Sequence, residues 1–217
     1  GIELYAETQR PDGMLWDGVF RADGKPTHRG TIFGYGTFAE LFPDGSAEFQ
    51  RIPVENDVEF LFLEGLYYTW KATGDTGWME SLLPAAMRAV EYATTDPLRW
   101  SKKLGLLKRG FTIDTWDYQP SMDEAITGHT MVVDANKSRF GAMHGDNTGM
   151  AAGLGYLAEM LVHVGRADEA DRYRKLEAQI RQHLDEVAWN GRFYTHHVPE
   201  DPDVERDFGV DQSTQVS

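Results

Sequence analysis

The chain has 217 residues, 41% of them hydrophobic, no cysteine, and a net charge of −14 at pH 7. This length suits one domain or part of a larger one, and the hydrophobic content is sufficient for a packed core. The negative charge argues against nucleic acid and anionic membranes as partners, because it repels phosphate groups. The absence of cysteine excludes disulfides, thiolate nucleophiles and cysteine-based metal sites, and no apolar run is long enough to cross a membrane.

Residues 1–55 are predicted to be a turn-rich, partly β segment of the same domain that continues from residue 56. Four Asp-Gly pairs mark turns, at 12–13, 17–18, 23–24 and 44–45. The short aromatic stretches between these turns predict strands, hairpins or irregular loops. A short helix is expected within residues 1–8.

A first pair of helices is expected between residues 56 and 95. Asn56 or Asp57 suits the N-cap of a helix that is apolar on nearly all sides, which indicates burial in a larger assembly. Gly74 is a suitable residue for ending that helix. A second helical segment runs from residue 76 to about 95. Because it contains Pro84, we expect a short helical turn followed by a main helix that begins at this proline.

A second pair of helices follows a long non-helical stretch, residues 96–145. Residues 148–163 are small and apolar and predict another buried helix, whereas 167–188 form the clearest amphipathic pattern in the chain. The order of buried helix, glycine-containing turn and amphipathic helix therefore occurs twice. This repetition is typical of the inner and outer helices of a toroid.

The first helical pair resembles a hairpin of the six-hairpin glycosidase superfamily, in residues 66–75, 82–84 and 89–92. The acidic start at 56–57 is similar to the helix start that lines the sugar site in several of those families. The Trp116-Asp117 pair resembles the Trp-Asp of trehalases and processing-type α-glucosidases, in which the aspartate is the general acid. The resemblance covers about 56–188. It implies an all-α fold, in which residues 56–217 are helical hairpins of a partial (α/α)6 toroid, and the activity of an inverting glycoside hydrolase.

A loop around residues 110–119 is the predicted acid side of a sugar cleft. Carboxylates exchange protons and bind hydroxyls, and aromatic rings stack on the apolar face of a pyranose. We expect Asp117 to be the general acid, with a pKa raised by its aromatic neighbours, because hydrolysis of a glycosidic bond needs two carboxyl groups. The alternative is an ion pair of Asp117 with Lys108 or Arg109. The substrate-binding candidates of this loop are Asp114, Trp116, Tyr118 and Gln119.

Further substrate-binding candidates lie at the starts of the two inner helices, which converge on one face of a toroid. They are Asn56, Asp57, His144, Asp146 and Asn147. An N-cap is the alternative for Asp146. His197 is a further candidate that could equally be structural. The catalytic base is expected outside this chain, after Ser217, since the chain resembles a piece of a longer polypeptide.

Two other functions are compatible with the same pattern. One is an epimerase, lyase or phosphorylase on the same toroid, and the other is a non-catalytic helical repeat that binds glycans. The sequence contains neither a cofactor motif nor a metal-binding motif. The stretch at 134–145 begins like a calcium loop, but it lacks the glycine and the glutamate that such a loop requires. The expected partner is a carbohydrate, without nucleic acid, membrane, cofactor or metal.

Overall fold

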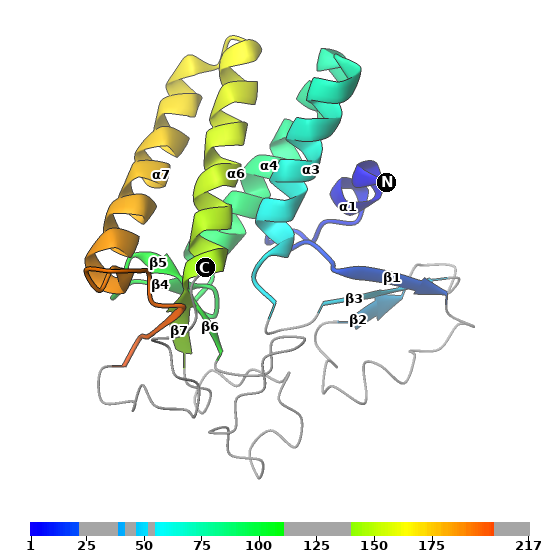
Figure 1. Cartoon of the computed structure of the whole chain (residues 1–217). Helices are drawn as coiled ribbons and strands as arrows, with labels where there is room; N and C mark the ends of the chain where they lie inside the picture. The colour runs from blue at the N-terminus through cyan, green and yellow to red at the C-terminus, as the bar shows by residue number, and fades with distance from the viewer. Residues whose placement is uncertain (22–38, 42–46, 52–54, 111–139, 202–217) are drawn as a thin grey trace.

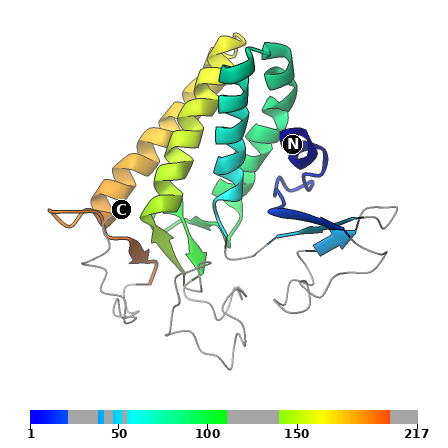
Figure 2. The ribbon, with the colours of Figure 1, turned by 45° about the vertical axis from the view of Figure 1, so that its right-hand side comes forward.

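In the part of the chain that the structure describes, four long helices form two hairpins that lie side by side (Figures 1 and 2). The first hairpin consists of α3 (Val58–Thr73) and α4 (Thr76–Thr95), and the second of α6 (His144–His163) and α7 (Ala167–Ala188). Helix α3 packs against both α4 and α6, and α6 packs against α7. The two helices whose sequences predict burial are therefore neighbours at the centre, and the amphipathic α7 lies outside them.

The structure is a computed structural model that describes residues 1–21, 39–41, 47–51, 55–110 and 140–201. Within these ranges the protein is helix-rich, with several short strands. The predicted helical pairs and the short N-terminal helix, α1 (Ile2–Glu7), are confirmed. In the described part of the chain, none of the helices combines the length and apolarity needed to cross a bilayer.

Local chemistry explains where the first hairpin turns. Gly74 adopts the left-handed conformation, with φ of 72°, and its N–H donates to the carbonyl of Trp70. The carboxylate of Asp75 then accepts a 2.9 Å hydrogen bond from the backbone N–H of Trp78 and caps α4. One glycine and one aspartate thus end one helix and begin the next within two residues.

The prediction of a new helix start at Pro84 was wrong, because α4 runs through this residue without a break. A proline removes one helical hydrogen bond, from its own position to the carbonyl four residues earlier. Glu80 and Pro84 are both exposed, so this carbonyl lies on the solvent side of the helix. Water can therefore satisfy it while the opposite face stays packed.

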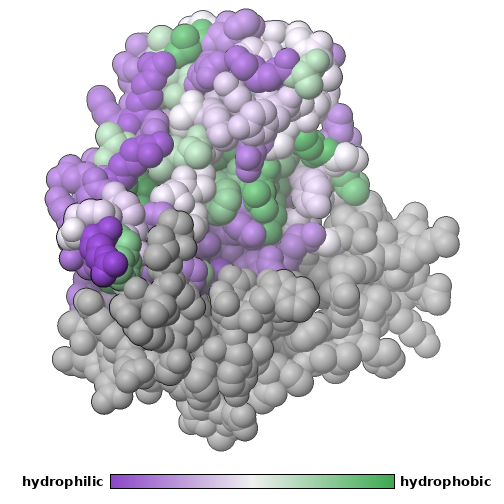
Figure 3. Space-filling model, viewed as in Figure 1, coloured by the Kyte–Doolittle hydropathy of each residue, from purple (hydrophilic) through white to green (hydrophobic). Residues whose placement is uncertain are grey.

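The core lies between the helices. Leu63 and Leu66 of α3 and Leu154 and Leu157 of α6 are fully buried. The small residues of α6 allow close approach, since a Cβ at Gly153 would lie 2.9 Å from Leu63. Apolar side chains also reach the surface, as Figure 3 shows by a hydrophobic patch at the middle of the helical face.

Short strands lie at the end of the molecule where α3 and α6 begin (Figure 1). The described residues form three antiparallel sheets, with the strand orders β1-β3-β2, β4-β5 and β6-β7-β8. The strands are β1 (Gly18–Arg21), β2 (Ala39–Leu41), β3 (Ala47–Gln50), β4 (Trp100–Ser101), β5 (Leu106–Leu107), β6 (Arg109–Gly110), β7 (Phe140–Met143) and β8 (His197–Pro199).

Strand β7 leads directly into α6, which begins at His144 and not at Thr148 as predicted. The backbone N–H of His144 donates to the carbonyl of His196, so the first residue of α6 is tied to the chain that precedes β8. This tertiary contact satisfies a helix-terminal N–H that the sequence pattern leaves without an acceptor.

Candidate functional site

Two buried asparagines at the starts of α3 and α6 hold the same stretch of backbone. Asn56 Nδ2 donates to the carbonyl of Lys108 at 3.2 Å. Asn147 Oδ1 accepts from the N–H of Leu107 at 2.8 Å, and its Nδ2 donates to the carbonyls of Leu107 and Met143 at 3.0 and 2.8 Å. The two amides thereby fix residues 107 and 108, just before the predicted acid loop of residues 110–119.

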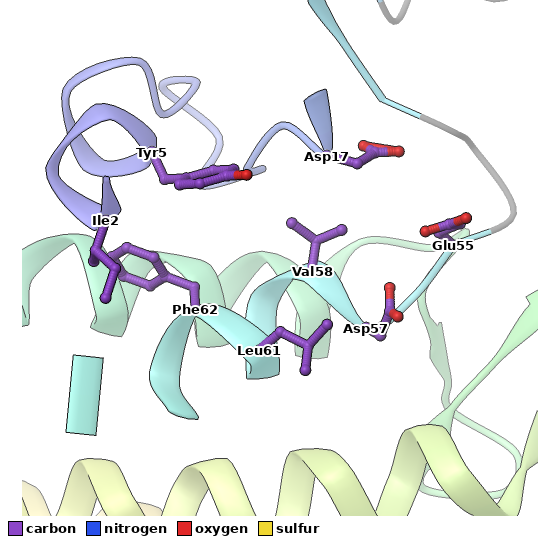
Figure 4. A pocket seen from close by; sticks show the side chains of 8 residues that line it. All are labelled: Ile2, Tyr5, Asp17, Glu55, Asp57, Val58, Leu61 and Phe62. Carbon is purple, nitrogen blue, oxygen red and sulfur yellow. The ribbon is translucent and has the colours of Figure 1, made fainter. Parts of the chain in front are cut away.

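A cavity of about 300 Å³ lies beside the start of α3. Its lining comes from α1, from the chain just before β1, from the residues just before α3, and from the first turns of α3. The lining residues are Ile2, Tyr5, Asp17, Glu55, Asp57, Val58, Leu61 and Phe62. Figure 4 shows the carboxyl groups of Asp17, Glu55 and Asp57 at one end of this cavity, with Ile2 and Phe62 at the other.

Glu55 is held at the acidic end of this cavity by two buried arginines. Its carbonyl accepts hydrogen bonds from Arg51 Nη2 at 2.9 Å and from Arg99 Nη1 at 2.8 Å. Both arginines are almost fully buried, at 0% and 2% exposure. The backbone of Glu55 is therefore fixed, and its side chain is presented to the cavity.

The pKa of the Glu55 carboxyl is raised to about 7. Burial is the largest cause, and the negative charges of Asp57 and Asp17 add to it, while Arg51 and Arg109 partly oppose it. At neutral pH this carboxyl is thus close to half-protonated. It can accept or donate a proton inside the cavity, which is the property required of an acid or base catalyst.

One of these two arginines, Arg51, is bound to a glutamate of α3. Arg51 forms a 3.0 Å ion pair with Glu59 and donates to the carbonyl of Leu15 at 3.0 Å. Glu59 Oε1 also accepts a hydrogen bond from the N–H of Leu15 at 3.3 Å. Arg51 and Glu59 therefore connect Leu15 of the N-terminal segment, Glu55 and α3 beside the cavity.

A second buried pair of charged residues lies at the start of α6. Asp146 and Arg109 are both buried, with 3.8 Å between Oδ1 and Nη1. The N-cap of α6 is Met143, so Asp146 lies in the first turn and does not have the N-cap position considered from the sequence. The pKa of the nearby His197 is lowered to about 3 by burial, by the charge of Arg109 and by His196, so its imidazole is neutral.

A second cavity, of about 330 Å³, lies between the start of α6 and the end of α7. It is lined by His144, Asn147, Thr148, Ala151, Ile180, Arg181, Leu184, Asp185 and Tyr194. The ring of His144 lies 4.7 Å from that of Tyr194. Burial lowers the pKa of His144, and the neighbouring His196 lowers it further.

The structure thus separates residues that the sequence assigned to one site. Asp57 lines the first cavity, while His144 and Asn147 line the second. Asn56, Asp146 and His197 are buried and line neither of these two cavities. The loop candidates lie outside the described residues: Asp114, Trp116, Asp117, Tyr118 and Gln119.

Sequence reasoning missed Asp17 and Glu55. Asp17 was interpreted only as part of an Asp-Gly turn, and Glu55 fell at the boundary between the N-terminal segment and the first helix. The available signal was the acidic pair Glu55 and Asp57 directly before a buried helix. Their approach to Asp17 depends on how the N-terminal segment packs, which local patterns do not contain.

Comparisons of this chain with protein-family models, with curated proteins and with solved structures found no match. The described residues also contain no group of three or more acidic or histidine side chains with the geometry to hold a metal ion. The groups that can carry chemistry at this site are its carboxyl groups and its cavity walls.

Proposed function

We propose that this chain is part of a carbohydrate-active enzyme, a glycoside hydrolase built on toroid-type helical hairpins. The cavity beside α3 is the observation that carries this proposal, because carboxyl groups gather at one end of it and apolar walls at the other (Figure 4). Its volume of about 300 Å³ is at the lower end for small-molecule sites and suits one sugar ring.

Both halves of the cavity match the chemistry of a pyranose. Its hydroxyl groups are hydrogen-bond partners for carboxylates such as those of Asp17 and Asp57. Its C–H faces suit the side chains of Tyr5 and Phe62. Asp117 remains the proposed general acid on the strength of the sequence resemblance. Glu55 is a further carboxyl that can exchange a proton at neutral pH.

The charge of the cavity favours hydrolysis over two of the alternatives on the same fold, a lyase and a phosphorylase. A lyase that acts on uronates must bind a substrate carboxylate, and a phosphorylase must bind phosphate. The described residues that line this cavity include three acidic side chains and no lysine or arginine. Such a lining repels anions, so a neutral sugar that reacts with water is the better fit.

Hydrolysis of nitrophenyl glycosides tests the proposal. The protein is incubated with the α- and β-anomers of several neutral hexosides, and NMR follows the anomer that is released first, which inversion predicts to be opposite to that of the substrate. Asp117→Asn should lower kcat by roughly 10²-fold or more, as expected for loss of a general acid. Glu159→Gln, at an exposed residue of α6, is the control and should leave kcat unchanged.

Two results would overturn the proposal. One is the absence of hydrolysis of every neutral glycoside by the wild-type protein. The other is cleavage of a uronate polymer with formation of an unsaturated product, which would identify a lyase. Full activity of Asp117→Asn would refute the assigned acid while leaving the hydrolase class intact.

A further inference from the structure

Three aromatic rings form a row at the edge of the second cavity. The ring centroid of Tyr194 lies 4.7 Å from that of His144 on one side and 5.0 Å from that of Trp189 on the other. Trp189 is 47% exposed, a large value for a residue of this size. The row therefore runs from the cavity to the surface.

The backbone around this row is held in place before any ligand arrives. Trp189 and Tyr194 form an antiparallel β-bridge. The carboxamide oxygen of Asn190 accepts hydrogen bonds from the N–H groups of Arg192 and Phe193, each at 3.0 Å, and closes the turn between the two rings. A binding surface whose rings are already fixed loses little conformational entropy when it binds.

The cavity beside the row has an apolar floor and a polar rim. Ala151, Ile180 and Leu184 supply buried apolar surface. On the rim, Arg181 bonds Glu177 Oε1 at 2.9 Å, and the hydroxyl of Tyr194 donates to the carboxylate of Asp185. This hydrogen bond raises the pKa of Tyr194, so the hydroxyl stays protonated. The charges of the rim are thus paired within the protein.

We propose that Trp189, Tyr194 and the cavity between α6 and α7 form a carbohydrate-binding surface for a neutral oligosaccharide. One sugar ring occupies the cavity of about 330 Å³, and the next stacks on the exposed face of Trp189. This surface shares no lining residue with the cavity of Glu55. It is a second site, whose occupancy does not depend on the proposed hydrolysis.

The chemistry of the surface disfavours other ligands. A phosphate-bearing ligand would approach the carboxylate of Asp185, and that of Glu177 beside Arg181, on a chain of net charge −14. A purely apolar ligand would remove the charged groups of Arg181 and Asp185 from water without replacing the hydrogen bonds that water makes to them. A saccharide has an apolar face for the rings and hydroxyls for the paired rim, and it carries no charge.

Binding of two glucose hexamers tests the surface. Maltohexaose and cellohexaose are titrated separately into the protein, with isothermal calorimetry for affinity and saturation-transfer NMR for the sugar protons in contact. We expect at least one of them to bind with a dissociation constant below about 1 mM. Trp189→Ala should weaken this binding roughly tenfold or more, because it removes the stacking surface. Polygalacturonate, an anionic polymer, should not bind.

Tyr68→Ala is the matched control, because Tyr68 is an exposed aromatic residue of α3 at 53% exposure that does not line this cavity. It should bind as the wild type does. All titrations are repeated in Asp117→Asn, so that sugar binding is measured without turnover. If the wild-type protein hydrolyses no glycoside but still binds a hexamer through Trp189, the surface is supported and only the proposed enzyme activity is refuted.

The proposal fails if neither hexamer binds, or if Trp189→Ala binds as tightly as Tyr68→Ala. Thermal unfolding of each variant shows whether the fold is intact. Trp189→Ala is expected to melt close to the wild type, since its ring is half exposed. Asp185→Asn keeps an acceptor for Tyr194 and supplies a second variant, which should weaken binding without loss of the fold.

Discussion

Arg51 and Glu59 form an ion pair of 3.0 Å with neither side chain exposed to solvent. The same guanidinium donates to the carbonyls of Leu15 and Glu55, so one buried charge connects three segments of the chain. This pair positions the acidic end of the cavity proposed as the sugar site. Its integrity should therefore matter both for the stability of the fold and for the geometry of Glu55.

Removal of one partner of this pair should be strongly destabilising. Arg51→Met leaves Glu59 as an uncompensated buried charge, and we expect the free energy of unfolding to fall by about 3–5 kcal/mol. Urea unfolding followed by circular dichroism measures the change. Lys71→Ala breaks a surface ion pair, that with Glu159, whose side chains are 47% and 49% exposed, and serves as the control. Its expected effect is about 1 kcal/mol or less. Similar losses in the two variants would contradict the assigned role of Arg51.

Asn147 makes two hydrogen bonds to the backbone of Leu107, and it should not tolerate replacement by aspartate, which has nearly the same shape. Asn147→Asp keeps an acceptor for the N–H of Leu107 but places a carboxylate against the carbonyls of Leu107 and Met143. We expect a loss of about 3 kcal/mol in the free energy of unfolding, because two buried acceptors lose their donors. Gln182→Glu is the control at an exposed position of α7. A loss of less than about 0.5 kcal/mol in Asn147→Asp would show that the region rearranges freely.

Gly13 should tolerate no side chain, for two separate reasons. Its φ is 96°, and a Cβ built on it would lie 2.3 Å from the carbonyl oxygen of Arg88. Gly13→Ala should thus separate the N-terminal segment from α4, with a loss of about 2 kcal/mol or more in stability. Gly74 has a φ of 72°, but a Cβ built on it would have no neighbouring atom within 4 Å. Gly74→Ala therefore measures the cost of the backbone conformation alone, about 1 kcal/mol of stability. Equal melting temperatures of the two variants would refute the steric contribution.

Glu55 should make stability decrease as pH rises. Its pKa is about 7 in the folded protein and 4.5 as a free side chain, so the folded state binds more protons between these values. Its contribution is complete below pH 4.5 and is lost as pH rises through 7. For a half-buried group we expect about 1–2 kcal/mol over this range after allowance for solvent screening. Glu55→Gln should remove this dependence, as measured by urea unfolding at pH 5 and pH 8, and an unchanged difference would contradict it.

His197 should act in the opposite direction. Its pKa is about 3 in the folded protein against 6.5 when free, so the unfolded state takes up the proton first on acidification. The contribution is complete above pH 6.5 and is lost as pH falls toward 3, by up to about 1.4 kcal/mol per pH unit. His197→Gln should reduce the loss in the free energy of unfolding between pH 6.5 and pH 3. The control variant is His163→Gln, at an exposed position of α6.

Much of the helical framework could be predicted from local patterns. The bounds of α7 follow from its apolar stripe, and the end of α3 follows from Gly74, because both signals lie within a few residues of the element they define. The start of α6 was placed four residues late. It depends on the hydrogen bond between His144 and His196, which are 52 residues apart in sequence. Pro84 was interpreted as a helix start because its sequence context does not show which side of α4 faces water.

In the candidate site, too, some features could be predicted from the sequence and others depend on tertiary contacts. Asn56 and Asn147 were correctly expected at the starts of the two central helices, yet their amides bind the backbone of residues 107 and 108. Asp57 lines the first cavity, but its neighbours Asp17 and Glu55 were not predicted, and the assignment of Asp117 stays a prediction of the resemblance.

The sequence by itself determined the helices, their buried and exposed faces, the acidity of the chain and the concentration of polar residues at the helix starts. These properties depend on side-chain type and on spacing along one helix. Only the tertiary structure decided that Asp17, Glu55 and Asp57 share a cavity, that Arg51 and Arg99 hold Glu55, and that His144 belongs to a different cavity. The physical reason is that burial and electrostatic interactions depend on distances between segments far apart in the chain, and packing sets those distances.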